Sequence, residues 1–138
     1  MKIKQISIFL ENSSGRLAEV TRVLKDGGVN LRAIMIADTA DFGILRVIVD
    51  DPDRAIDILK KAQFTTKTTD VLAVTLPDKV GSLADVLSLF EKNGVNIEYL
   101  YAALDKAGET AVVIIRTDDL DKGLKVVESN GLGTTSKF

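Results

Sequence analysis

The sequence predicts an α+β protein in which one βαββαβ unit occurs twice in tandem, over residues 1–69 and 70–138. The main observation is an internal repeat, because the pattern around Gly15 recurs around Gly81, 66 residues later. Two further observations are apolar residues that alternate along expected strands and apolar residues at helical spacing between them. The residues that match at this offset include Gly15, Leu17, Ala18, Val20, Gly28 and Asn30, which recur as Gly81, Leu83, Ala84, Val86, Gly94 and Asn96.

Each copy is expected to begin with a strand whose apolar side chains alternate, as in a half-buried sheet. A turn then leads into a helix with an apolar face. This helix ends at Gly27-Gly28 or Asn93-Gly94, because glycine tolerates the left-handed conformation at a helix C-terminus. The residues of the apolar helix faces are Leu17, Val20 and Leu24 in the first copy and Leu83, Val86, Leu87 and Phe90 in the second.

Two more strands, a second helix and a last strand complete each copy. Asp51 and Pro52 open the second helix as N-cap and first helical residue, and Asp118 or Asp119 does so in the second copy. This order is the ferredoxin-like plan, an antiparallel sheet with helices on one face. The expected strands are residues 3–10, 30–37, 43–49 and 64–69 in the first copy and 71–76, 96–104, 110–116 and 132–138 in the second.

The third strand of each copy is apolar on both faces. In the first copy Ile44 and Ile48 alternate with Leu45 and Val47. A sheet face without helices should be polar if it meets water. We therefore expect the helix-free face or the sheet edges to be covered by the sister unit or by a second chain.

Composition argues against several classes of function. The chain has 18 basic and 20 acidic residues, a net charge of −2, which does not suit nucleic acid or an anionic membrane. It has no Cys and no His, so it lacks a thiolate and the commonest general base and metal ligand. We expect no catalytic residue, metal or cofactor, and hence no enzyme. No signal peptide or membrane-spanning run is seen, and we expect a cytoplasmic protein.

The repeated feature that could bind a ligand is the turn after the first strand. It leads into a helix N-terminus, where unpartnered backbone N–H groups and the helix dipole can bind an anion. Gly15 or Gly81 lets a ligand approach the backbone, and Asn12 or Asp78 can contact a second polar group. This pattern would suit the carboxylate and ammonium of a free α-amino acid. The alternative is purely structural, because Asn, Asp and Ser at a helix start commonly act as caps.

The string Gly-x-Leu-Ala-x-Val, followed further on by Gly-Val-Asn, resembles the signature of the ACT domain family and occurs twice. The resemblance, closer in the second copy, is to small stand-alone tandem ACT proteins. It implies that a free amino acid or similar metabolite binds between the first loop of one domain and the start of the second strand of its neighbour. It also implies a homodimer formed through sheet edges and a possible regulated enzyme partner. The ligand-binding residues that it implicates are Asn12, Ser14, Gly15, Arg16, Leu17, Asn30 and Leu31 in the first copy and Asp78, Val80, Gly81, Ser82, Leu83, Asn96 and Ile97 in the second.

Both copies depart from the common form of this family, in which a proline often precedes the loop glycine. Ser14 and Val80 stand at that position. The first copy also has Asn12 where an aspartate is frequent, as at Asp78. An ionised carboxylate favours a ligand ammonium more than a neutral amide does, so the two sites need not be equivalent.

Two other groups of residues have structural interpretations. Acidic residues gather at both second-helix starts, where they can cap the helix and complement its dipole, and they lack the spacing of a calcium loop. Tyr99 and Tyr101 lie two residues apart on one strand face, and we expect them to cover the helix-free face rather than line a ligand pocket. The acidic residues are Asp50, Asp51 and Asp53 in the first copy and Asp118, Asp119 and Asp121 in the second.

Two functions compete with a small-molecule sensor. One is a scaffold whose edges mediate oligomerisation without a ligand. The other is an acylphosphatase-like enzyme, since such enzymes share the ferredoxin-like plan and use a loop with an Arg and an Asn, which Arg16 and Asn30 could supply. Ser82 replaces this arginine in the second copy, and an analogy of fold is a weak argument for function.

Overall fold

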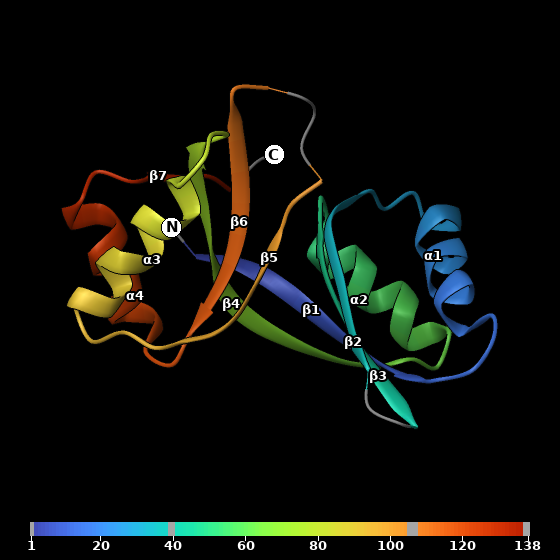
Figure 1. Cartoon of the computed structure of the whole chain (residues 1–138). Helices are drawn as coiled ribbons and strands as arrows, with labels where there is room; N and C mark the ends of the chain where they lie inside the picture. Colours follow the sequence, from blue (N-terminus) through green and yellow to red (C-terminus); the bar gives the residue numbers. More distant parts are fainter. Residues whose placement is uncertain (1, 39–40, 105–107, 137–138) are drawn as a thin grey trace. The chain divides into compact units, whose positions relative to one another are not determined.

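The computed structural model describes residues 2–38, 41–104 and 108–136 (Figure 1). It confirms the α+β class and the repeated ferredoxin-like order. The elements of the first copy are β1 (Lys2–Glu11), α1 (Arg16–Asp26), β2 (Leu31–Asp38), β3 (Phe42–Val49), α2 (Pro52–Lys61) and the first part of β4 (Thr65–Pro77). Those of the second copy are the rest of β4, α3 (Ser82–Lys92), β5 (Ile97–Ala102), β6 (Thr110–Thr117), α4 (Leu120–Ser129) and β7 (Gly133–Thr134).

Contacts divide the chain into two compact units. One contains Lys4–Thr69, and the other contains Asp70–Phe138 together with Met1–Ile3. In the first unit the strand order is β2-β3-β1-β4, with β2 at the edge. In the second unit β6 lies between β4 and β5, so β5 is at an edge, and β7 pairs with β4.

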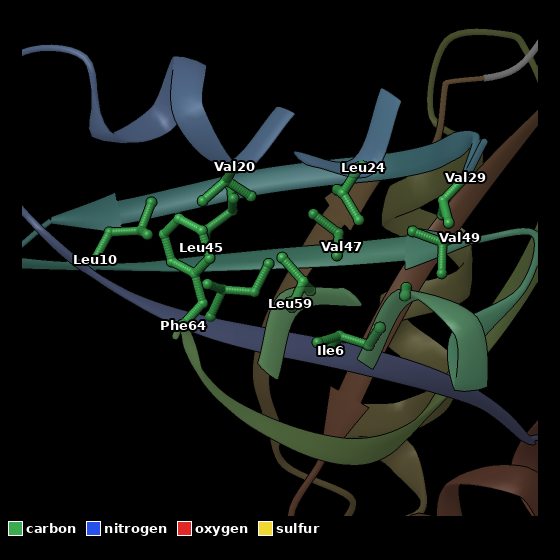
Figure 2. Packing of buried hydrophobic residues seen from close by; sticks show 12 residues of the cluster. Ile6, Leu10, Val20, Leu24, Val29, Leu45, Val47, Val49, Leu59 and Phe64 are labelled. Atoms are coloured by element: carbon green, nitrogen blue, oxygen red, sulfur yellow. The ribbon is translucent and has the colours of Figure 1, made fainter. Parts of the chain in front are cut away.

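The core of the first unit lies between its sheet and the helices α1 and α2 (Figure 2). Period-two alternation buries Ile6, Ile8 and Leu10 on the helix-facing side of β1, opposite the apolar residues of β3. Helical spacing brings Val20 and Leu24 of α1 onto the same core. The second unit repeats this arrangement with Leu72, Val74 and Leu76 of β4 and with Val86 and Phe90 of α3 among its buried residues.

Strand β4 differs from the expected pattern. We expected separate strands over residues 64–69 and 71–76, but β4 runs without a break from Thr65 to Pro77. No glycine or proline interrupts the segment before Pro77, and Thr and Val have high strand propensity. One continuous strand therefore ends the first copy and begins the second.

Two strands of the second copy are shorter than expected. β5 ends at Ala102, although the N–H of Ala103 still donates to the carbonyl of Val112 over 2.9 Å. β7 is only Gly133–Thr134 rather than residues 132–138, of which 137 and 138 lie outside the described part. Leu132 is not in the strand because its N–H bonds the carbonyl of Val127 and completes the end of α4.

The helix-free face of the sheets is buried only in part. Phe9 lies on this face of β1 and is 41% exposed, so the expected cover holds for some apolar residues of this face and not for others. Ala33 and Ile48 of the first unit are 0% and 5% exposed, and Ala73 and Ile114 of the second are fully buried. Tyr101 pairs with Ile114 in the β5–β6 register, so its side chain lies on this face. Tyr101 is 6% exposed and therefore packs on the helix-free face, as predicted. In the described part of the chain, no helix is long and apolar enough to cross a membrane.

Candidate ligand-binding loops

The turns between β1 and α1 and between β4 and α3 have the same geometry. The N–H of Asn12 donates to the carbonyl of Asp41, and that of Asp78 donates to Glu109, each over 2.9 Å. Gly15 and Gly81 have φ of 87° and 88°, a left-handed conformation that glycine adopts without a Cβ clash. The repeat in the sequence therefore encodes one loop conformation that is built twice.

The helices that follow these loops lack side-chain caps, unlike the other two helices. Asp51 caps α2 by accepting from the N–H of Arg54 over 3.2 Å, and Asp119 caps α4 by accepting from Lys122 over 3.0 Å. The N-cap residues of α1 and α3 are Gly15 and Gly81, which have no side chain that could accept. The capping interpretation is therefore correct for Asp51 and Asp119 and wrong for Asn12, Ser14 and Asp78.

Several backbone N–H groups at these helix starts make no hydrogen bond with other described residues. They belong to Gly15, Leu17 and Ala18 at α1 and to Gly81, Leu83 and Ala84 at α3. A helix leaves its first N–H groups without intrahelical partners, and together with the helix dipole they favour an anion. A Cβ built on either loop glycine would meet no atom within 4 Å, so the approach to the backbone is open.

Apolar side chains are exposed beside the same N–H groups. Leu17 and Leu83 are 39% and 37% exposed, and Val80 is fully exposed. Large apolar side chains next to unsatisfied polar backbone are typical of a surface that another molecule covers. Each loop thus offers polar donors and apolar contact area together.

Arg16 and Ser82 occupy equivalent positions but differ in their surroundings. The guanidinium of Arg16 lies 2.8 Å from Glu19 and 3.5 Å from Glu11, and it stacks 4.8 Å from the centroid of the Phe64 ring. These contacts hold it beside the loop and compete with any ligand carboxylate. Ser82 is 6% exposed, and its hydroxyl makes no hydrogen bond with the described residues.

Asn30 and Asn96 are held by an aspartate that the sequence analysis assigned to helix capping. The N–H of Asn30 donates to a carboxylate oxygen of Asp50 over 2.9 Å, and that of Asn96 donates to Asp118 over 3.1 Å. The N–H of each aspartate donates back to the asparagine carbonyl. Both asparagines are exposed. The repeat of Asp50 as Asp118 was the signal that could have revealed this role.

The remaining acidic residues of the two clusters form ion pairs. Asp53 lies 3.3 Å from the amine of Lys4, and Asp121 lies 2.6 Å from that of Lys2. Each carboxylate in the clusters thus has its own structural partner. Among the described residues no group of three or more acidic side chains is arranged to hold a metal ion.

Within one copy, the loop and the asparagine do not come together. Gly15 precedes α1 and Asn30 follows it, and a helix of 11 residues is about 16 Å long. Figure 2 shows the same separation, with Leu10 near the loop at one end of the core and Val29 at the other. Arg16 and Asn30 therefore do not form the shared anion site that an acylphosphatase-like mechanism would need.

Two surface hollows mark the two ends of α1. The larger, about 370 Å³, is open and lies beside Lys25, Asn30 and Leu31. The smaller, about 150 Å³, is more enclosed and lies at the loop. We call the smaller one the loop hollow, and its lining includes Leu10, Asn12, Ser13, Leu17, Ile36 and Gly43. Sequence reasoning missed Ile36 and Gly43, although a glycine inside a strand can mark a close approach by a ligand.

The fold and the repeated loops define a pair of ACT domains. The family described as ACT domain pair matches residues 1–136, and the chain belongs to it. Protein BT0572 from Bacteroides thetaiotaomicron is 45% identical in sequence, with a TM-score of 0.92, over 98% of this chain and 92% of that one.

More distant structures share the fold. The regulatory subunit of aspartate kinase from Thermus thermophilus, in a ligand-free form, is 17% identical with a TM-score of 0.65, over 91% of this chain and 90% of that one. Aspartokinase III from E. coli, in complex with lysine and aspartate, is 15% identical with a TM-score of 0.52, over 91% of this chain and 30% of that one. No curated protein matches the chain.

Proposed function

We propose that this chain is a non-catalytic regulatory module that binds a free amino acid or a similar small metabolite at its repeated loops. The observation that carries the proposal is the contrast between helices: α2 and α4 have aspartate caps, whereas α1 and α3 leave their N–H groups open behind glycine. Open N–H groups at a helix start suit a carboxylate. Asp78, an exposed residue with a carboxylate side chain, suits the ligand ammonium.

The distance between the loop and the asparagine supports binding at an interface between domains. One copy offers the loop at one end of α1 and the exposed Asn30 at the other. A neighbouring domain whose first helix runs in the opposite direction would bring its asparagine to the loop. In a homodimer formed through the edge strands β2 or β5, each ligand would contact two domains and so favour the assembled state.

Structures with the same fold also support the proposed function. The aspartokinase that is in complex with lysine and aspartate has a similar fold in part of its chain, so this fold occurs in a protein that binds amino acids. The present chain would act in the same general way, as the part that senses a metabolite, with an enzyme as a possible partner. The ligand must bind one arrangement of the domains more tightly than another to have a regulatory effect.

Thermal unfolding against a panel of free amino acids, each near millimolar, tests the proposal. A ligand at about 100 times its Kd that binds only the folded protein adds about 2.7 kcal/mol of stability, which raises Tm by several degrees. We expect one chemical class to raise Tm and expect Asp78→Ala or Asn96→Ala to weaken the effect. Asp51→Ala is the control, because it removes a helix cap and should lower Tm without changing the ligand-induced rise.

A flat response across the panel, with a stable dimer in sedimentation, would contradict amino-acid binding. It would favour the scaffold function, in which the same edges mediate assembly alone. Turnover of acetyl phosphate by the chain would contradict the non-catalytic assignment.

A further inference from the structure

We infer that the loop hollow of the first copy receives the aliphatic side chain of the bound ligand, so that this copy selects a small apolar amino acid. The inference rests on the proposed function and adds the class of ligand to it. Leu17, whose N–H group is open at the start of α1, is one of the residues that line the hollow, so a ligand anchored at this helix start by its carboxylate can extend into it.

Part of the wall of the loop hollow is apolar. Leu10, Leu17 and Ile36 form this part, while Glu11, Asn12 and Ser13 contribute the polar part at the loop. Leu17 and Ile36 are 39% and 48% exposed, so both side chains have area that a ligand can cover. Burying apolar area is favourable by about 25 cal/mol per Å², whereas a polar ligand group placed against this wall would lose hydrogen bonds to water.

The hollow is large enough for an aliphatic side chain. Its volume is about 150 Å³. A branched side chain of three or four carbon atoms fits this space and covers the apolar part of its wall. The ligand class is therefore that of valine, isoleucine and leucine.

Gly43 keeps the hollow open. It is buried near the start of β3, opposite Leu10 of β1. A Cβ at this position would lie 3.4 Å from Cδ1 of Ile36, in ordinary contact and inside the space between the two strands and the loop. Glycine weakens a strand interior relative to alanine, and one reason for its presence is the close approach of a ligand.

The second copy differs at the two positions that shape the hollow. Ile36 pairs with Leu45 as Ala102 pairs with Val113, and Gly43 pairs with Leu10 as Ala111 pairs with Leu76. The second copy thus has Ala102 at the position of Ile36 and Ala111 at the position of Gly43. These substitutions assign the apolar selectivity to the first copy.

Isothermal titration calorimetry on the full chain tests the inference. The probes are valine, leucine and isoleucine, compared with glycine, aspartate and lysine. We expect an aliphatic amino acid to bind at least tenfold more tightly than the polar ones. Gly43→Val should fill the hollow and weaken aliphatic binding at least tenfold, whereas Ala111→Val, the same position in the second copy, should leave it unchanged.

A second variant keeps the test decisive if Gly43→Val does not fold. Ile36→Asn places an amide on an exposed part of the wall and should reduce aliphatic affinity at least fivefold while circular dichroism remains unchanged. Tighter binding of a polar than of an aliphatic amino acid, weakened by Gly43→Val, would overturn the inference and leave the proposed function intact. Aliphatic binding that neither Gly43→Val nor Ile36→Asn weakens would also overturn the inference. Absence of binding by any amino acid would overturn both.

Discussion

Gln63 adopts a backbone conformation that its side chain disfavours. Its φ is 67°, and it is the single non-glycine residue with positive φ in the described part of the chain. It follows α2, where the next N–H, that of Phe64, donates to the carbonyl of Leu59 over 2.9 Å. Gly131 holds the equivalent position after α4 with φ of 64°. The second copy therefore shows which residue this helix end favours.

We predict that Gln63→Gly stabilises the protein. A left-handed residue with a side chain costs about 1–2 kcal/mol, and the greater entropy of unfolded glycine offsets about 0.5–1 kcal/mol of that gain. The net increase in the free energy of unfolding should be about 0.5–1 kcal/mol in urea titrations. Gly131→Ala is the matched control and should destabilise by a similar amount. A destabilised Gln63→Gly variant would show that the Gln63 side chain stabilises this turn.

The contact partners of individual side chains were the least predictable part of the candidate site. The sequence indicated which loop recurs, because Gly15 and Gly81 need the same left-handed φ. It did not indicate that Arg16 contacts Glu11 and stacks on Phe64, because Phe64 is close to it only in the folded unit. Such partners depend on tertiary packing, which a pattern of residue types along the chain does not contain.

The four helices provide a direct comparison of two kinds of N-terminus. Asp51 and Asp119 cap α2 and α4, and we predict that replacing either with alanine lowers the free energy of unfolding by about 1 kcal/mol. Asp78→Ala should cost less than about 0.5 kcal/mol, because this exposed side chain caps no helix. Urea titration of the three variants without ligand checks the contrast. A loss for Asp78→Ala as large as that for Asp51→Ala would indicate that Asp78 has a structural role.

Helices and strands were predictable to the extent that local patterns determine them. The alternation of Ile6, Ile8 and Leu10 identified β1 because these apolar side chains share the face that packs against the helices. The unbroken β4 was missed because a repeat suggests a boundary where the copies meet. A change of unit does not require a turn when strand-forming residues continue across it.

The repeat was sufficient to predict the fold of each unit and, with the resemblance to ACT domains, the family. Two copies of one pattern imply two copies of one structure, because the same residues meet the same local constraints. The grouping of Met1–Ile3 with the second unit was not predictable in the same way. It depends on contacts between residues more than 100 positions apart, such as Lys2 with Asp121.

The ion pair between Lys2 and Asp121 joins the start of the chain to α4, and it should make stability depend on pH. The amine of Lys2 donates a hydrogen bond of 2.6 Å to the Asp121 carboxylate. This bond lowers the pKa of Asp121 and raises the pKa of Lys2 relative to their ordinary values. The stabilisation from Asp121 is present above the ordinary aspartate pKa and is lost as pH falls through the lowered value. That from Lys2 is present below the ordinary lysine pKa and is lost as pH rises through the raised value.

We therefore predict that Lys2→Met lowers Tm only between these limits. The difference from the original protein should be small near neutral pH, because the side chains of Lys2 and Asp121 are 38% and 78% exposed, and it should shrink further in high salt. It should vanish once pH falls below the lowered pKa of Asp121. Lys67→Met is the control, because Lys67 forms no ion pair with the described residues and its removal changes only the net charge. A Tm difference that persists unchanged at acid pH would mean that Lys2 stabilises the second unit through packing of its alkyl chain rather than through its charge.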